Sequence, residues 1–268
     1  MQILRITERN RLELQPGLEA LETQATYPLG SDFFKIDHGD DYFHFFRRLG
    51  LLTYYAIVHD DGTVIGAAAG ILRRLPFKPD GVARRTFYLC DLKISPAHRG
   101  RNVSLKLATY GLFRHYLRCP RGYAITMNDP SQKTNRIVHL AHKFRWASTD
   151  VAGPLLIFSL DAERMNQLAP VVVKHRGPLS YLSLRGIKDI VLQSTGAPMP
   201  LLHVQFGPCA AEGEVAPLSG HTHMFCTPSR DPLAAELKGL GYEPSASATI
   251  LHHRMRGADW SFILTSDI

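Results

Sequence analysis

The sequence predicts an α+β protein in which a mixed central sheet is flanked by helices and is followed by a second, smaller α+β unit. Two apolar runs flank the turn 59–62, which ends in the Asp-Gly pair typical of a β-hairpin. After Pro96 the apolar period lengthens to that of a helix, which predicts a helix over 103–117. The strand and helix patterns of 123–160 are loosely repeated at an offset of about 96 residues, which predicts a second unit over 161–268.

Breaker residues divide the first half into alternating strands and helices. A Pro-Gly pair begins a helix at residue 16, and Asp40 and Asp41 can cap a helix that runs to about Arg48 and ends at Gly50. The aromatic segment before Asp40 is expected to be irregular. The expected elements are strands over 1–7, 53–58, 63–75, 86–95, 123–127 and 154–160, and helices over 16–24, 42–48, 103–117 and 134–146.

The second half is harder to read from periodicity. Its expected elements are helices over 162–168 and 232–240, and strands over 180–184, 190–192, 200–206, 221–226, 248–255 and 260–266. About 14 residues separate the strands 200–206 and 221–226, which is too few for a basic loop followed by a full helix. The second unit is therefore expected to lack a phosphate-binding part.

The positive charge of the chain is concentrated in one window. Its 31 Lys and Arg against 24 Asp and Glu give +7, but residues 1–72 carry −4 and 146–268 carry −2. Residues 73–145 hold 16 basic and 3 acidic side chains, a net charge of +13. Such a block indicates a nucleic acid, a phosphorylated cofactor, an acidic carrier protein or a membrane surface, and a solvated basic face is the alternative. Because no nucleic-acid motif accompanies it, no nucleic-acid partner is expected.

The cysteines and the hydropathy pattern indicate a cytoplasmic protein. None of the four cysteines forms a CxxC pair, so neither a zinc module nor a disulfide framework is expected. The first residues lack the apolar core of a signal peptide. No stretch approaches the roughly 20 apolar residues that span a bilayer, so no membrane span is expected.

The run YLCDLKISPAHRGRNVSLKL (88–107) carries the chemistry. Backbone N–H groups that converge at a helix N-terminus bind pyrophosphate, and small residues let the phosphate come close. The run resembles the acyl-CoA-binding loop of the GNAT superfamily of N-acyltransferases at Ile94, Pro96, Arg99, Gly100 and Leu107. Asn102 and Ser104 stand where the family has Gly or Ala. Asn readily takes left-handed backbone angles, and Ser can donate its hydroxyl, so the loop remains usable.

The resemblance extends over residues 53–160. The helix after the fifth expected strand carries Asn135, Ala141 and His142 in the family's register, and Arg145-Trp146 replaces the family's Gly-Phe. The resemblance implies a GNAT fold, with residues 1–160 as the acyl-CoA-binding catalytic domain. Residues 161–268 are then a degenerate GNAT-like domain that shapes the acceptor or acyl pocket.

The resemblance also implies a donor site. Acetyl-CoA or a longer acyl-CoA is the implied co-substrate, with its thioester along the strand before the loop and its pyrophosphate in the loop. The residues implied in donor binding are Leu92, Lys93, Ile94, Arg99, Gly100, Arg101, Asn102, Val103, Ser104, Asn128 and Asn135.

Two side chains are candidates for proton transfer. Asp91 lies on the strand where the family often has a carboxylate, and it is the expected general base. Strand alternation also puts Asp91 and Lys93 on one face, so a buried ion pair is the alternative. His142 stands where the family often has a Tyr that serves the leaving thiolate, and a histidine can donate a proton near neutrality. The alternative for His142 is a structural or solvated position on the helix.

The aromatic and acidic segment before the hairpin is the expected acceptor site. Its carboxylates suit a cationic amine, although Asp40 and Asp41 can also serve only as helix caps. The residues expected to bind the acceptor are Phe34, Asp37, Asp40, Asp41, Tyr42 and Tyr88. No metal is expected, since His221 and His223 can share a strand face but no third ligand is evident.

These observations predict an N-acyltransferase that moves an acyl group from acyl-CoA to a primary amine of an amino acid, a peptide or a small molecule. One alternative is a long-chain acyltransferase that uses acyl carrier protein, since carrier and CoA share the phosphopantetheine arm. Another is a non-catalytic GNAT-fold module that binds an effector, which the departures at Asn102 and Ser104 support.

Overall fold

The structure is a computed structural model that describes residues 1–78, 81–116, 118–129, 135–143 and 148–268. Its helices are α1 (Arg11–Glu22), α2 (His44–Arg48), α3 (Val103–Tyr116), α4 (Arg136–Lys143), α5 (Ala162–Arg176) and α6 (Pro232–Gly239). Its strands are β1 (Gln2–Ile6), β2 (Tyr27–Leu29), β3 (Asp32–Asp37), β4 (Leu51–Val58), β5 (Val64–Leu75), β6 (Arg84–Ile94), β7 (Gly122–Met127), β8 (Asp150–Leu160), β9 (Ser180–Leu182), β10 (Asp189–Leu192), β11 (Leu201–Gln205), β12 (Thr222–Pro228) and β13 (Ala246–His253).

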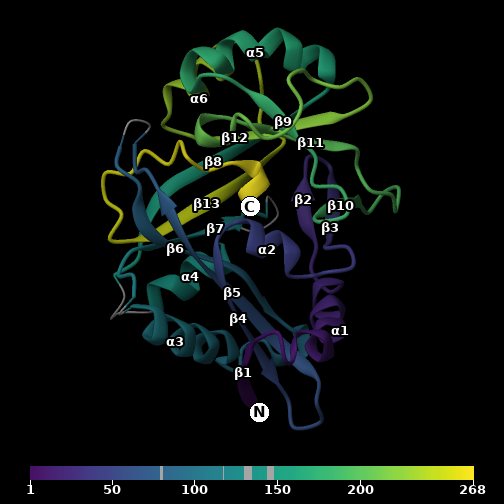
Figure 1. Cartoon of the computed structure of the whole chain (residues 1–268), viewed down its shortest axis with the longest axis vertical. Coiled ribbons are helices and arrows are strands. Elements are labelled where there is room, and N and C mark those ends of the chain that lie inside the picture. The colour runs from purple at the N-terminus through teal and green to yellow at the C-terminus, as the bar shows by residue number, and fades with distance from the viewer. Residues whose placement is uncertain (79–80, 117, 130–134, 144–147) are drawn as a thin grey trace.

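One ten-stranded sheet passes through the molecule, in the order β1-β4-β5-β6-β7-β13-β8-β12-β11-β9 (Figure 1). It is mixed, since β6 and β7 pair in parallel while β4, β5 and β6 pair antiparallel. A separate three-stranded sheet has the order β10-β3-β2. The α+β class with a mixed sheet flanked by helices, as the sequence predicts, is confirmed.

Strand β13 joins the two halves of the chain. It pairs antiparallel with β7 on one side and with β8 on the other. Strands from 1–160 and from 161–268 therefore alternate in the middle of one sheet. Over the described residues, neither half forms a separate sheet of its own.

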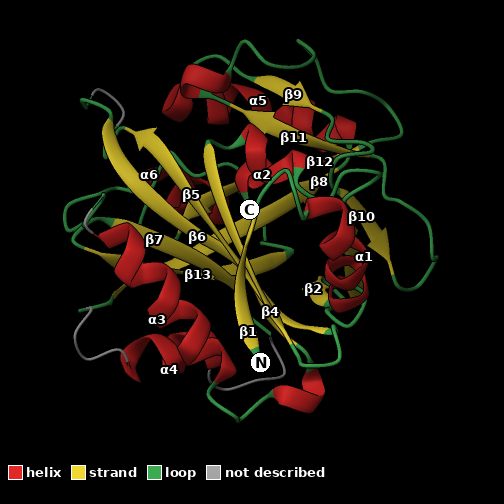
Figure 2. Ribbon diagram, turned by 60° about the horizontal axis from the view of Figure 1, so that its bottom comes forward, coloured by secondary structure: helices red, strands yellow, loops and turns green. Residues whose placement is uncertain are grey.

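Helices cover both faces of the first half of the sheet. Neighbouring residues of a strand point to opposite faces, and on β4 Tyr54 packs with Tyr42 next to α2, whereas Tyr55 packs with Tyr110 of α3. Helices α1 and α2 thus lie on one face and α3 on the other, and Figure 2 shows α3 and α1 on either side of β4. In the second half, α5 and α6 pack on β8, β11 and β12. Asp161 and Asp231 begin these two helices by accepting hydrogen bonds from the backbone N–H groups of Arg164 and Leu233.

The structure corrects four expectations. Helix α1 begins at Arg11, five residues early, and contains Pro16. Segment 26–39 is a β2–β3 hairpin with Gly30 at φ 60°, because β10 supplies a partner from 150 residues away that no local pattern reveals. Helix α5 continues to Arg176 through Pro170. Residues 260–266 form turns and the start of a short 3-10 helix in place of a strand, and the Thr265 and Ser266 hydroxyls bond His203 and Gln205 of β11.

None of the helices in the described ranges is long and apolar enough to cross a membrane. Over the same ranges, no group of three His, Cys, Asp or Glu side chains is arranged to hold a metal ion. The four cysteines are free.

Candidate active site

The site begins where β6 and β7 separate. The two strands pair in parallel only over Phe87–Leu89 and Gly122–Ala124. Beyond this point β7 follows its other partner, β13, as far as Met127, while β6 remains paired with β5. The edge of β6 from Cys90 to Ile94 therefore has no ladder partner in β7 over the described residues. Apart from the Ile94 carbonyl, which accepts the Arg99 Nε–H at 3.3 Å, no hydrogen bond to this edge is seen over those residues.

A β-bulge in β6 bends the strand at this point. The register shifts from Ala69 opposite Cys90 to Ala67 opposite Lys93, and Asp91 has a φ of 54°. A non-glycine residue with positive φ is sparsely populated and is held in place by its surroundings. The bulge widens the separation from β7 and directs both Asp91 and Lys93 toward α1 and α2.

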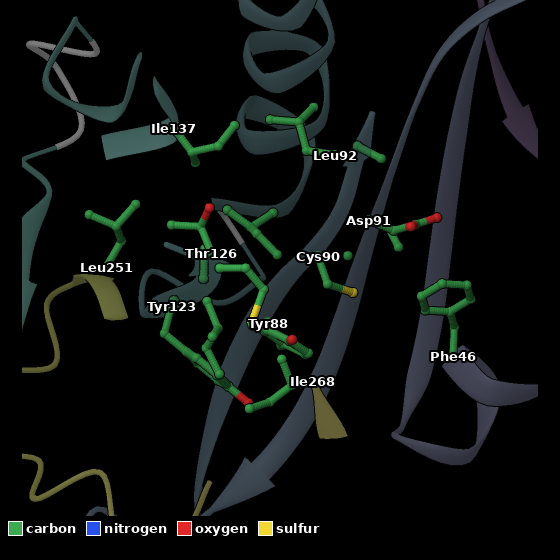
Figure 3. A pocket seen from close by; sticks show the side chains of 18 of the residues that line it. Phe46, Tyr88, Cys90, Asp91, Leu92, Tyr123, Thr126, Ile137, Leu251 and Ile268 are labelled. Carbon is green, nitrogen blue, oxygen red and sulfur yellow. The ribbon is translucent and has the colours of Figure 1, made fainter. Parts of the chain in front are cut away.

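A cavity of about 380 Å³ passes through the sheet at this separation. On the α3 side it is lined by residues that include Leu107, Gly111, His115, Ile137 and Ala141, here called the donor half. On the α2 side it is lined by residues that include Tyr27, Phe34, His38, Phe45, Phe46, Lys188 and His203, here called the acceptor half. In Figure 3, Ile137 and Leu251 lie on one side and Phe46 on the other, with Cys90 and Thr126 between them.

Asp91 belongs to a buried charged cluster. Its carboxylate pairs with the Lys93 ammonium and accepts hydrogen bonds from the hydroxyls of Tyr54 and, at 2.9 Å, Tyr42. Lys93 also pairs with Glu22 of α1, and all three charged side chains are at most 8% exposed. The expectation that Asp91 and Lys93 share a face is therefore met, and the ion pair exists. Of the three, Asp91 and Lys93 reach the cavity wall.

Burial and ion pairing shift the pKa values of Glu22 and Lys93 in opposite directions. Burial would raise the pKa of Glu22, but the adjacent His38 and Lys93 lower it overall. Burial lowers the pKa of Lys93 in spite of Glu22. Burial also raises the pKa of Tyr42 and of Tyr54 well above 10, so both remain neutral hydrogen-bond donors.

The predicted phosphate loop lies at the N-terminus of α3. Arg99, Gly100, Arg101 and Asn102 are exposed, and Gly100 and Asn102 have φ angles of 79° and 57°. The expectation that Asn102 takes left-handed angles in place of Gly is thus met. Its carbonyl accepts the Lys106 N–H at 2.9 Å, which starts the helix. Val103 is buried, while Ser104 is half-buried on the first turn. Exposed arginines thus adjoin the positive end of a 14-residue helix.

The two asparagines implied in donor binding are engaged within the protein. The Asn128 side chain bonds Ser247 at 3.1 Å and Thr249 at 2.7 Å, and so ties β7 to β13. Asn135 donates to Asn128 at 3.1 Å and accepts the Ile137 N–H at 3.0 Å, and so caps α4. His142 has its backbone in α4, and its side chain lies outside the described part of the structure.

The residues expected to bind the acceptor separate into two groups. Phe34 and Tyr88 line the cavity, and Tyr42 adjoins it through Asp91. Asp37, Asp40 and Asp41 do not line it. Asp41 instead accepts the Phe43 N–H at 3.0 Å before α2 and pairs with Arg47, and Asp37 accepts the Gly39 N–H at 2.9 Å.

Several lining residues have no counterpart among the residues expected from the sequence. They are Tyr27, Ile36, His38, Phe45, Phe46 and Lys188. The alternation of Phe34, Ile36 and His38 is a strand signal that could have shown one face of 32–38 turned to the cavity. Lys188 has no local signal, since only the pairing of β10 with β3 brings it there.

Comparisons with known proteins support the fold. No family model matches the chain. An uncharacterized protein of Acanthamoeba polyphaga mimivirus is 26% identical over 241 aligned positions, which cover 85% of this chain and 68% of the viral protein. A tandem GNAT protein from the clavulanic acid biosynthesis pathway superposes with a TM-score of 0.51 at 14% identity, over 96% of this chain and 100% of that one.

A second solved structure is larger than this chain. It is the fungal multi-domain GH3 β-N-acetylglucosaminidase with a GCN5-related glucosamine N-acetyltransferase region, at a TM-score of 0.49 and 10% identity. The match covers 94% of this chain, which spans 38% of that protein. Since the tandem protein matches along its whole length, and since the β6–β7 separation leads to an arginine loop at a helix N-terminus, the chain has the fold of the GCN5-related N-acetyltransferases.

Proposed function

We propose that this chain is an N-acyltransferase that moves an acyl group from acyl-CoA to the primary amine of an amino acid, a peptide or a small molecule. One observation carries the proposal: a cavity passes through the sheet between β7 and β6, the strand that runs into the arginine loop, and has a buried carboxylate, Asp91, in its wall. Such a passage lets a thioester and an amine approach one point from opposite faces.

The reaction needs few groups. The amine nitrogen attacks the thioester carbonyl carbon, the C–S bond breaks, and the nitrogen loses a proton while the thiolate leaves. The unpaired edge of β6 at Leu92–Ile94 supplies backbone N–H groups for the oxyanion. We assign Asp91 as the base and His142 as the donor of a proton to the thiolate.

The second half completes the cavity. Lys188, His203, Met224, Thr265 and Ile268 all line it, so residues 161–268 form part of its wall. We propose that these residues, as a degenerate GNAT-like domain, shape the acceptor or acyl pocket. Acetyl-CoA is the first donor to test, and native mass spectrometry after incubation with acetyl-CoA or with acyl carrier protein distinguishes the two sources of the pantetheine arm.

Reversing the loop charges, R99E with R101E, is expected to raise the Kd for acetyl-CoA about 100-fold, because two charge-assisted contacts to phosphate become repulsive. Isothermal titration calorimetry measures this. The matched control is R84E with R85E, which makes the same change of net charge at the opposite end of β6. Equal affinity in both double variants would show that the loop is not the phosphate site.

Replacing His142 by alanine is expected to lower kcat about 10- to 100-fold with the Kd for acetyl-CoA unchanged, because proton donation to the thiolate acts only during turnover. Stopped-time assays of CoA release with a panel of amines give kcat. An unchanged kcat removes His142 from the mechanism.

The full pairing of Asp91 with Lys93 and two tyrosines favours a second candidate, a GNAT-fold module that binds an effector without turnover. Acetyl-CoA binding without CoA release beyond slow hydrolysis, over the whole amine panel, would establish it in place of the enzyme.

A further inference from the structure

Lys188 places an ammonium group in the wall of the acceptor half. It directly precedes β10, and its backbone N–H donates to the Leu184 carbonyl at 2.9 Å, which fixes the turn into that strand. The pairing of Asp189 with Asp37 brings it beside His38, and both line the cavity. Lys188 is 7% exposed, so the cavity is the space that its charge faces.

The other polar groups of the acceptor half have partners or are neutral. Asp91 and Lys93 pair with each other. His203 bonds the Thr265 hydroxyl at 3.0 Å, and burial lowers its pKa to about 3, so it is neutral. Burial raises the pKa of the Cys90 thiol to about 12, so it is neutral as well. None of these side chains is an unpaired anion.

Lys188, by contrast, forms no ion pair and no side-chain hydrogen bond with any residue of the described ranges. Its ammonium lies 4.3 Å from the centre of the Phe45 ring, a cation–π contact. Asp267, the carboxylate that most raises the pKa of Lys188 against the effect of burial, is already paired with Arg73 at 2.8 Å. A buried ammonium of this kind is stabilised by an anion that enters the cavity.

We propose that Lys188 binds a carboxylate of the substrate, so that the amine acceptor is an amino acid or another amine that carries a carboxylate. The inference rests on the proposed transferase function and names its substrate class. The acceptor is the favoured source because Lys188 stands on the face opposite the arginine loop. The aromatic wall formed by Tyr27, Phe34, Phe45 and Phe46 suits an apolar side chain on that acceptor.

The first experiment measures binding of product analogues, which needs no turnover. N-acetyl-L-leucine and N-acetyl-L-phenylalanine are titrated against their amides, in the presence of CoA, with wild type, K188M and K188R. We expect wild type to bind each acid at least about tenfold more tightly than its amide, K188M to lose this preference, and K188R to keep part of it. K174M, which removes an exposed lysine on α5, is the matched control and is expected to behave as wild type.

The preference is also expected to depend on pH. Burial lowers the pKa of Lys188 to about 8, so its charge, and with it the preference for the acid, is lost as the pH rises from 7 to 9.5. Neither analogue has an amine that titrates. The charged and titratable groups that act on Lys188 are Asp267, Cys90, Glu22 and Lys93, and Lys188 acts in turn on His38 and His203. K188R keeps its charge over this range, so its preference stays constant.

The second experiment identifies the source of the carboxylate. CoA release is compared for acetyl-CoA with leucine or leucinamide, and for succinyl-CoA with leucinamide. A K188M variant that loses activity only toward leucine confirms the acceptor assignment. A K188M variant that loses activity only with succinyl-CoA would show that Lys188 binds a carboxylate of the acyl donor, which overturns that assignment.

Failure of the inference and failure of the transferase function give different results. If wild type does not bind acetyl-CoA, the proposed function is wrong. If it binds acetyl-CoA but binds acids no more tightly than amides, or binds neither, only the role of Lys188 is wrong. Circular dichroism of K188M shows whether the variant is folded, which distinguishes a folding defect from both results. K188M is expected to fold, because methionine is a neutral side chain in an apolar site.

Discussion

Replacing Lys93 by methionine is expected to lower the free energy of unfolding by about 3–5 kcal/mol, the usual cost of removing one partner from a buried ion pair. Lys93 pairs with both Glu22 and Asp91, and all three side chains are at most 8% exposed. Without the ammonium, two carboxylates face each other in the core, and at least one must take up a proton. Urea unfolding at pH 7, followed by circular dichroism, measures the loss.

The loss is expected to shrink as the pH falls. In wild type the pKa of Glu22 is lowered, so its stabilising contribution is present above the unfolded pKa near 4.5 and is lost as the pH falls through the folded value. In K93M the buried carboxylates gain protons more readily on folding, so acid stabilises the variant relative to wild type. K174M removes a lysine that is 65% exposed, and it is expected to change stability by less than about 1 kcal/mol. A K93M variant as stable as K174M would contradict the buried pair.

Replacing Asp91 by asparagine is expected to lower kcat about 100- to 10,000-fold if Asp91 is the base, since proton transfer by a positioned group contributes about this much. The substitution keeps the size of the side chain and one oxygen that can accept from Tyr42 and Tyr54. The Kd for acetyl-CoA is expected to stay close to that of wild type. CoA release under saturating donor gives kcat, and calorimetry gives the Kd.

Glu22→Gln is the matched control, because Glu22 faces the same Lys93 but does not line the cavity. Both variants remove one carboxylate from one buried cluster and are expected to lose similar stability. Only D91N is expected to lose kcat. Equal activity of the two variants would assign Asp91 a structural role and would favour the effector-binding module.

Local pattern predicts the strands and helices of residues 51–127, whereas the start of α1 and the β2–β3 hairpin are missed. The β4–β5 hairpin follows from its Asp-Gly turn, and α3 follows from the change of period after Pro96. The loop between β6 and α3 can be located for the same reason, since Arg99, Gly100 and Asn102 are neighbours in sequence and their backbone angles are local properties. Strand alternation also predicts the shared face of Asp91 and Lys93, although a β-bulge at Asp91 interrupts that alternation in the structure.

Pairing between distant segments decides the rest. The β2–β3 hairpin is stabilised by β10, and β13 enters the sheet between β7 and β8, so neither position can be read from a local window. The acidic residues Asp37 and Asp40 illustrate the limit. Their negative charge suits a cationic amine. The register of β3, however, buries Phe34 and His38 and leaves Asp37 exposed at the surface.

The sequence by itself predicts the loop proposed to bind phosphate, because that loop is short and lies at a helix N-terminus. Only the tertiary structure decides the cavity between β6 and β7. The bulge at Asp91 depends on pairing with β5, the separation of β6 from β7 depends on the pairing of β7 with β13, and the place of Lys188 depends on the pairing of β10 with β3. The burial and charge of the residues in this cavity depend on which distant segments pack together. The hydrophobic period of a segment predicts that it is buried, but not which other segment it packs against.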